Sequence, residues 1–146
     1  MQEILFIKIV QFFLEHPFKE FYLRELAQQL KVSPFAIKKY ADMLLHEQLI
    51  VEERKANLRY FKANVANAFY RHLKIAFNIH LLFKSGLIDH LKKNTPNLSS
   101  ITLFGSMAKG ENDATSDIDL LIIGKRAVIN LSKYTEKLNQ EATIHF

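Results

Sequence analysis

Two apolar runs separated by a polar segment constrain the fold of this 146-residue chain more than any other feature. The first run ends in a Gly-Ser pair, Gly105 and Ser106, and the second begins with Asp117 and Asp119. Because side chains along a strand alternate between its faces, Asp117 and Asp119 point the same way while Ile118 and Leu120 point into the sheet. The pattern predicts a strand, a short helical turn, a polar loop and a second strand.

The polar residues at these strand ends suit the binding of a metal and a phosphate. Two carboxylates on one strand face lie roughly 6–7 Å apart along the chain and can share a hard divalent cation such as Mg²⁺. The Gly-Ser turn offers backbone N–H groups at the start of a helix, a good place for a phosphate. A phosphate-binding turn beside a pair of metal-binding carboxylates is the arrangement that nucleotidyl or phosphoryl transfer requires.

The same residues resemble the signature of the nucleotidyltransferase superfamily that includes DNA polymerase beta. The likeness is carried by Gly105, Ser106, Ala108, Gly110 and residues 116–120, and it is greatest to the minimal nucleotidyltransferase domains of prokaryotes. A bare Gly-Ser or Asp-x-Asp pair is common, but this combination at this spacing is rare by chance. The alternative is a turn followed by a strand whose aspartates are merely solvated.

The resemblance implies a role for each polar residue of the signature. It implies that Asp117 and Asp119 are catalytic and hold Mg²⁺, and that Gly105 and Ser106 bind the phosphates of a nucleoside triphosphate (NTP). Lys109 either neutralises phosphate charge or is an ordinary surface lysine. The implied reaction transfers a nucleoside monophosphate to a protein or RNA acceptor, often in an antitoxin that partners a small helical toxin.

One feature of the C-terminal segment departs from the family pattern. Active members usually supply a third carboxylate from a third strand, expected here over residues 142–146. On that strand the face that would meet the aspartates carries Thr143 or His145, and Glu141 lies just before it. The departure favours an alternative function, a transcription regulator that senses nucleotide without turnover.

Residues 1–63 are expected to form one unit. Its first helix has apolar residues from Ile4 to Leu14 and ends at His16-Pro17, and further helices are expected over residues 23–30 and 34–46, the last with Ser33 as N-cap and Pro34 in the first turn. Two alternating segments, 49–53 and 59–62, then predict a β-hairpin. With this order of elements, the segment Leu23 to Val51 resembles a winged helix-turn-helix domain. Gln48 stands where such domains often carry a glycine to end the helix in a left-handed turn.

The third of these helices would enter the DNA major groove if this segment binds DNA. The expected contacts come from its outward face and from the hairpin, namely Phe35, Lys38, Lys39, Arg54, Lys55 and Arg59. The alternative is a solvated basic face on a domain that docks to a protein. Phe35 on the outward face and the acids Asp42 and Glu47 favour that alternative.

Residues 64–97 are expected to form a helical joint between this domain and a nucleotidyltransferase-like domain over residues 98–146. The helix predicted from Asn64 or Asn67 to Gly86 is apolar nearly all round, so it must be covered on several sides. We therefore expect a homodimer built partly on this helix, or else packing within one chain. The expected class is α+β, with a winged helix, a long joint helix and a small mixed sheet.

Composition excludes several other functions. The chain has no cysteine, so disulfides, thiolate zinc sites and cysteine nucleophiles are excluded. Its start lacks the pattern of a signal peptide and no long uncharged apolar stretch occurs, which predicts a cytoplasmic protein without membrane contact. Residues 64–97 hold 5 Lys or Arg against 1 Asp, whereas residues 98–146 hold 5 against 6 acids. The predicted metal-binding segment is thus the acidic one.

Three functions therefore remain open. The first is an active Mg²⁺-dependent nucleotidyltransferase with a DNA-binding or docking winged helix. The second is a DNA-binding regulator with a nucleotide-sensing domain that has lost turnover. The third is an interaction protein that binds neither ligand. The carboxylate pair supports the first two equally.

Overall fold

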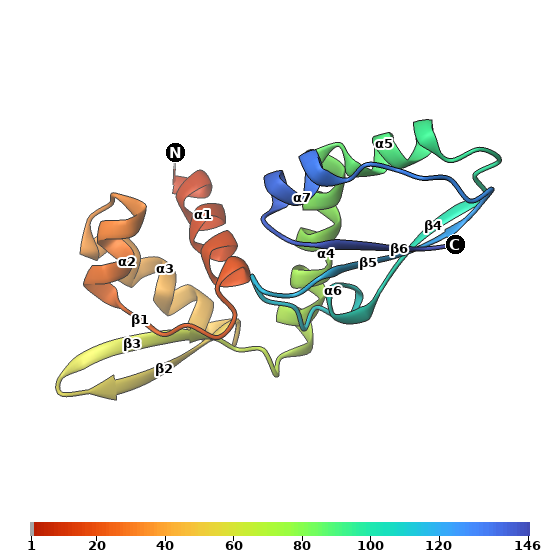
Figure 1. Ribbon diagram of the computed structural model, residues 1–146. Helices are drawn as coiled ribbons and strands as arrows, with labels where there is room; N and C mark the ends of the chain where they lie inside the picture. Colours follow the sequence, from red (N-terminus) through yellow and green to blue (C-terminus); the bar gives the residue numbers. More distant parts are fainter. Residues whose placement is uncertain (1) are drawn as a thin grey trace. The chain divides into compact units, whose positions relative to one another are not determined.

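The computed structural model describes residues 2–146, and side chains from Leu5 onward, so Met1 of the expected first domain lies outside the described residues. The chain divides into two compact units, one ending at Arg71 and the other comprising His72–Phe146. Each unit combines helices with a three-stranded sheet, as the α+β class requires (Figure 1). The two units are described separately.

The first unit contains the elements that its hydrophobic pattern predicts. In chain order they are α1 (Gln2–Glu15), β1 (Phe21–Tyr22), α2 (Leu23–Leu30), α3 (Pro34–His46), β2 (Ile50–Lys55) and β3 (Leu58–Ala63). The Ser33 hydroxyl accepts a hydrogen bond from the Ala36 N–H at 3.2 Å, which confirms the predicted N-cap of α3. Gln48 adopts the left-handed conformation, with φ at 57°, in place of the glycine usual there.

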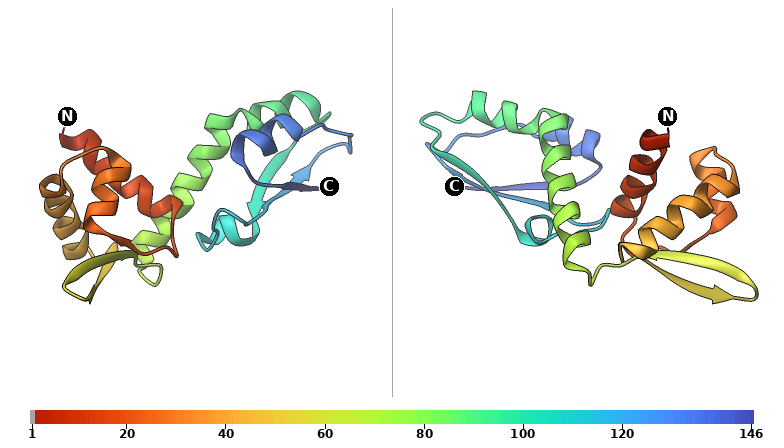
Figure 2. Two further views of the ribbon diagram at one scale, coloured as in Figure 1. Left: turned by 60° about the vertical axis from the view of Figure 1, so that its left-hand side comes forward. Right: turned by 180° about the vertical axis from the view of Figure 1, so that it is seen from behind.

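The sheet of the first unit has the order β1-β3-β2, with all pairs antiparallel. Strands β2 and β3 form a hairpin whose turn residues, Ala56 and Asn57, have φ of 47° and 65°. Two left-handed residues in a row give the turn geometry that matches strand twist. The hairpin extends beyond the helices of its unit (Figure 2).

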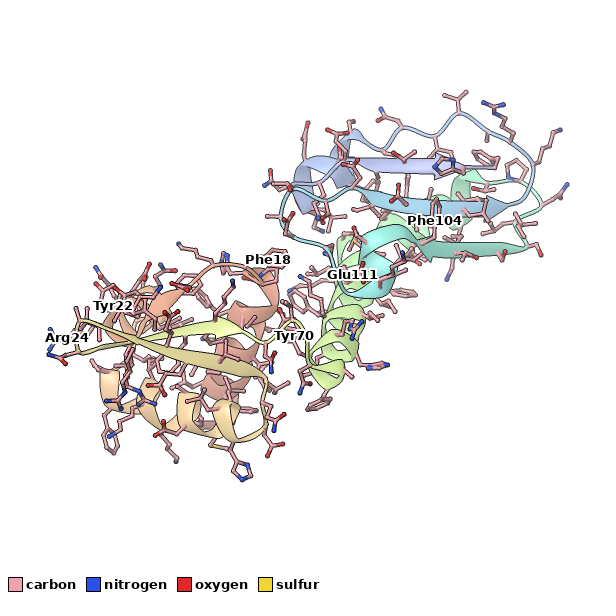
Figure 3. The ribbon with its side chains drawn as sticks, turned by 90° about the horizontal axis from the view of Figure 1, so that it is seen from below. Phe18, Tyr22, Arg24, Tyr70, Phe104 and Glu111 are labelled. Atoms are coloured by element: carbon pink, nitrogen blue, oxygen red, sulfur yellow. The ribbon has the colours of Figure 1, made fainter. Side chains whose placement is uncertain are left out.

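Aromatic side chains form much of the core of the first unit. Phe12 and Phe21 lie 4.5 Å apart between ring centroids, and Phe13 meets Phe21 at 6.4 Å, both edge to face. Tyr70, labelled in Figure 3, donates a hydrogen bond from its hydroxyl to the Phe13 carbonyl at 2.8 Å. Burial raises the pKa of Tyr70, because the phenolate would lose its hydration.

The second unit contains the two apolar runs. Its elements are the C-terminal part of α4 (Ala68–Ser85), then α5 (Leu87–Asn94), β4 (Ser100–Phe104), α6 (Gly105–Lys109), β5 (Ile118–Ile123), α7 (Ser132–Leu138) and β6 (Ala142–His145). Asn67 caps α4, since its side-chain oxygen accepts from the Tyr70 N–H at 3.0 Å. Gly86, with φ at 85°, separates α4 from α5 as predicted.

The sheet of the second unit is mixed, as the sequence predicts. Its order is β4-β5-β6, with β4 antiparallel and β6 parallel to β5. One sheet face is covered by α5 and α7 (Figure 1), and the core there includes Leu87, Leu91, Ile118, Leu120 and Ile122. The other face carries the β5 side chains that alternate with the buried ones, and Asp119 is the first of them.

No helix in residues 2–146 is long and apolar enough to cross a membrane.

Candidate functional site

The two aspartates lie where β5 begins, beside the turn that follows β4. Asp119 is half-buried on β5 and pairs in register with Phe104 on β4 and Thr143 on β6. Asp117 is exposed and stands just before the first residue of β5. The antiparallel pairing of β4 and β5 brings the end of the first strand to the start of the second. The signature residues therefore meet although a polar loop separates them in sequence.

Gly105 lies directly against the carboxylate of Asp119. Its φ of 73° is in the left-handed region, which glycine adopts without strain. A Cβ added at Gly105 would collide with the Asp119 Oδ2 atom and lie 3.3 Å from its Cγ. The turn backbone can approach the carboxylate this closely only because residue 105 has no side chain.

A buried amide pair holds the helix that follows this turn. The side chain of Asn78, on α4 and 1% exposed, donates to the Met107 carbonyl at 2.9 Å and to the Asn112 side-chain oxygen at 2.7 Å. Asn112 donates back to Asn78 at 3.2 Å. Met107 itself is fully buried on α6. These contacts fix α6 and, through it, Gly105 and Ser106, while Lys109 at the end of α6 is exposed.

The loop that leads to the aspartates is ordered around Asp113. Its carboxylate accepts from the Thr115 N–H at 2.8 Å, from the Thr115 hydroxyl at 2.7 Å and from the Ser116 hydroxyl at 3.3 Å. The hydrogen bond from the Thr115 hydroxyl is the main reason why the pKa of Asp113 lies below its ordinary value. The charged form of Asp113 therefore stabilises the loop.

Gln140 ties the same loop to the start of β6. Its side-chain amide donates to the Ser116 carbonyl at 3.0 Å and to the Asp113 carbonyl at 3.2 Å. The Ile118 N–H donates to the Glu141 carbonyl at 2.8 Å. Asp117, between these two attachment points, is held from both sides.

The β6 residue beside Asp119 is a threonine and not a carboxylate. Thr143 is the β6 residue in register with Asp119, and His145 is in register with Leu121. By the alternation along β6, Glu141 shares the sheet face of Thr143 and is exposed. Among residues 2–146, no three His, Cys, Asp or Glu side chains gather closely enough to form a metal cluster of their own.

The carboxylate oxygens of Asp117 and Asp119 fit one particular mode of Mg²⁺ binding. Mg²⁺ is commonly held by one or two carboxylates together with substrate phosphates, and keeps several waters. Asp119 provides oxygen ligands directly beside the backbone of Gly105. The residues therefore fit an ion shared with a phosphate ligand.

The predicted DNA contacts of α3 lie at the surface of the first unit. Phe35 is 81% exposed, and Lys38 and Lys39 are also exposed. The Lys39 ammonium lies 5.6 Å from the centroid of the Tyr40 ring. These three side chains are accessible to a partner.

The predicted contacts of the hairpin are paired with acids instead. Arg59 donates to Glu52 at 2.6 and 3.2 Å and to Asp42 at 2.8 Å. The main cause of the lowered pKa of Glu52 is its hydrogen bond from Arg59, and the same bond is the main cause of the raised pKa of Arg59. Arg54 lies 3.6 Å from Glu52.

Lys55 is the third paired cation of the hairpin. Its ammonium contacts Glu20 at 2.7 Å and Glu53 at 3.6 Å. The hydrogen bond from Lys55 lowers the pKa of Glu20 and raises that of Lys55. A phosphate backbone would have to compete with these carboxylates for Arg54, Lys55 and Arg59.

Sequence reasoning missed the residues that support the site, Asn78, Asn112, Asp113 and Gln140. Asn78 does carry a signal, because an asparagine between Phe77 and Ile79 is unfavourable in an apolar helix unless its amide has a partner. Nothing local marks Gln140, whose partners come from a loop 24 and 27 residues earlier.

Residues 84–145 match the family model of the nucleotidyltransferase domain. The matched segment runs from the end of α4 to the last residue of β6 and contains every signature residue described above. It supports nucleotidyl transfer as the general activity of the second unit, with an NTP as substrate. Searches of curated proteins and of solved structures found no match to the chain.

Proposed function

We propose that the second unit transfers a nucleoside monophosphate from an NTP to a protein or RNA acceptor. The observation that carries the proposal is the contact between the Gly105 turn and the Asp119 carboxylate. It brings the Gly-Ser turn, the proposed phosphate site, against the carboxylate of Asp119, within the segment that matches the nucleotidyltransferase domain.

In this proposal each residue has a defined task. The Gly105 N–H and Ser106 bind the β- and γ-phosphates, and Lys109 neutralises part of their charge. The acceptor hydroxyl attacks the α-phosphorus, a new O–P bond forms, the bond to the β-phosphate oxygen breaks, and pyrophosphate leaves as the hydroxyl proton passes to solvent. The fixed turn and loop hold the substrate in place, so catalysis comes mainly from positioning and charge stabilisation.

Asp117 and Asp119 would hold Mg²⁺ in the loaded protein. The ion, when bound, supplies positive charge that neutralises the phosphates and stabilises the leaving group. Glu141 and Thr143 are the nearest residues of β6 on the same face, and Thr143 cannot replace a carboxylate as an anionic ligand.

The test is transfer of label from an NTP, with calorimetric binding of NTP alongside it. Asp119→Asn keeps the side-chain shape but removes the charge, so we expect transfer to fall at least about 100-fold, more than the loss of an outer-shell partner costs. Mg²⁺-dependent NTP binding should vanish in the double variant Asp117→Asn/Asp119→Asn. Equal binding by the parent and the double variant would refute the proposal.

We further propose that the first unit is a winged helix-turn-helix that docks onto DNA or a protein. Its order of helices and hairpin, with α3 following a short turn after α2, supports this proposal. The accessible groups for such docking are Phe35, Lys38 and Lys39 on α3. In this proposal the paired cations of the hairpin contribute less to docking than these three side chains do.

The second candidate function is a DNA-binding regulator whose second unit senses nucleotide without turnover. The observation that favours it is Thr143, which stands opposite Asp119 where active relatives usually have a carboxylate. This candidate predicts NTP binding without transfer, and a DNA affinity that changes when NTP is added. Steeply salt-dependent binding to duplex DNA, lost in Lys38→Ala/Lys39→Ala, would support it.

Several finer expectations stay predictions of the sequence. They are the homodimer, an antitoxin-like role with a toxin as partner or acceptor, and a cytoplasmic location.

A further inference from the structure

The open face of the second unit's sheet is unusually apolar. By alternation along the strands, Phe104, Leu121 and Ile123 share the face of Asp119, and they are 39%, 39% and 56% exposed. Exposed apolar side chains that adjoin one another mark ligand or partner sites more often than isolated ones do. Of these three, Phe104 is in register with Asp119, the carboxylate that the proposed function assigns to catalysis, and Leu121 lies in the next row.

Two aromatic rings from opposite edges of this sheet meet on that face. Phe104 is on β4 and His145 on β6, yet their ring centroids lie 5.4 Å apart with an interplanar angle of 62°. We call Phe104 and His145 the aromatic pair. Since β5 is the central strand, the two rings come together across it.

The register locates the aromatic pair relative to the catalytic residues. Phe104 is opposite Asp119, and His145 is opposite Leu121, two residues further along β5. One pleat repeat, roughly 7 Å, therefore separates the row of Asp119 from the row of His145. Figure 3 views the sheet from the side away from α5, with Phe104 labelled at the end of β4 beside the start of α6.

We propose that the aromatic pair binds the base of the nucleotide. This inference rests on the proposed function, which puts the phosphates at Gly105 and Ser106. The base lies at the other end of the nucleotide from the phosphates, so an aromatic surface that extends from the row of Asp119 to the row of His145, about one pleat repeat away, is suitably placed to receive it. Stacking of a base on an aromatic side chain tolerates any base, because every base has a π-face.

The test compares two ligands that share the triphosphate and differ in the nucleoside. Calorimetry in Mg²⁺ measures binding of ATP and of inorganic tripolyphosphate to the full chain. The parent should bind ATP more tightly than tripolyphosphate. Phe104→Ala and His145→Ala should each weaken ATP binding about tenfold, the effect of losing a stacked base, and leave tripolyphosphate binding unchanged.

Two further variants separate stacking from structural damage. Phe104→Tyr keeps the ring and should retain ATP affinity. Ile123→Ala removes an exposed apolar side chain from the far end of the same face, opposite Ser100, and should leave both ligands unaffected.

Each other result counts against a specific claim. Equal losses for ATP and tripolyphosphate, or unchanged ATP affinity in both alanine variants, would overturn the base site alone. A parent that binds the two ligands equally would also overturn it and leave the proposed function standing. A parent that binds neither ligand would overturn both.

Discussion

In the hairpin of the first unit, the cations Arg54, Lys55 and Arg59 each lie beside a carboxylate. In the sheet of the second unit, Asp117 and Asp119 have no ion-pair partner among the residues that the structure describes. The first arrangement satisfies its charges internally. The second leaves the negative charge of Asp119 unpaired within the described part of the chain, next to the Gly105 turn.

The difference teaches how to tell structural charges from functional ones. A cation that already has two acceptors, as Arg59 has, gains little from a phosphate and contributes to the stability of the hairpin. Carboxylates without a counterion in the protein remain available to an external cation. On this criterion the carboxylates of the second unit are the better candidates for binding a ligand.

The largest effect should come from giving the carboxylates a partner of their own. Thr143→Lys puts an ammonium opposite Asp119, where it would compete with Mg²⁺ for that carboxylate. We expect Mg²⁺-dependent NTP binding, measured by calorimetry, to fall about 10- to 100-fold, the range seen when a metal site loses a supporting interaction.

The matched control places the same charge on the same face but one row away. Thr102 is exposed on β4, opposite Leu121, so Thr102→Lys should leave the Mg²⁺ dependence nearly intact. Undiminished Mg²⁺-dependent binding in Thr143→Lys would mean that Asp119 does not take part in the site.

A second prediction concerns the contact that joins turn and carboxylate. Gly105→Ala introduces a left-handed alanine and a collision with Asp119, whereas Gly86→Ala has the left-handed φ but only an ordinary 3.6 Å contact with Tyr134. Gly86→Ala should lower the free energy of unfolding by about 1–2 kcal/mol, the cost of the backbone conformation. Gly105→Ala should lower it further, and it alone should weaken NTP binding.

Urea unfolding measures the stability of Gly105→Ala and Gly86→Ala, and calorimetry measures their NTP binding. If both variants lose the same stability and neither changes NTP affinity, the collision with Asp119 has no functional meaning.

A third, smaller effect is expected in the paired region. Arg59→Ala leaves Glu52 and Asp42 without their shared partner and should destabilise the hairpin by about 1–2 kcal/mol. Arg54→Ala, at a position where the side chain is 76% exposed, should cost less than about 0.5 kcal/mol. Hydrogen exchange of the β2 and β3 amides measures both, and equal protection in the two variants would show that Arg59 is not structural.

The smallest effect is the response of the hairpin to acid. The pKa of Glu52 is lowered in the folded protein, chiefly by its hydrogen bond from Arg59. The pair therefore stabilises the hairpin fully above the ordinary glutamate pKa of 4.5, and this contribution disappears as pH falls through the lowered pKa. The protection factors of the hairpin amides, which correct for the intrinsic pH dependence of exchange, should fall between pH 5 and pH 3, by about one order of magnitude or less for a partly exposed pair.

Glu52→Gln provides the comparison for the acid response. This variant cannot titrate at residue 52, so its hairpin should lose less protection over the same pH range. The interpretation fails if parent and variant respond alike.

Local patterns were enough to predict most of the elements. Strand β5 has the predicted bounds, 118–123, because it is a short apolar run that ends at Gly124, and Ser33 with Pro34 marks the start of α3. The signature turn and the aspartate pair are also local features, which is why they could be recognised before the fold was known.

Features that depend on distant partners could not be predicted in this way. The sequence predicts Arg59 as a DNA contact on the hairpin, but it does not predict its ion pairs. The partners, Asp42 and Glu52, lie on other elements, 17 and 7 residues earlier. The Asn78–Asn112 pair spans 34 residues, and the aromatic pair joins strands that are not neighbours in the sheet. In each case the function of the side chain is set by a contact that only the tertiary fold creates.

The attachment of the aspartate loop to β6 has a consequence for the order of events during synthesis. Strands β4 and β5 are close in sequence and can pair early, but β6 emerges from the ribosome only after the segment that contains α7. Until then Gln140 cannot hold the Ser116 carbonyl, and the Ile118 N–H has no strand partner on that side. The growing chain thus carries its signature residues before it can arrange them, and ligand binding should begin only when the last strand has joined the sheet.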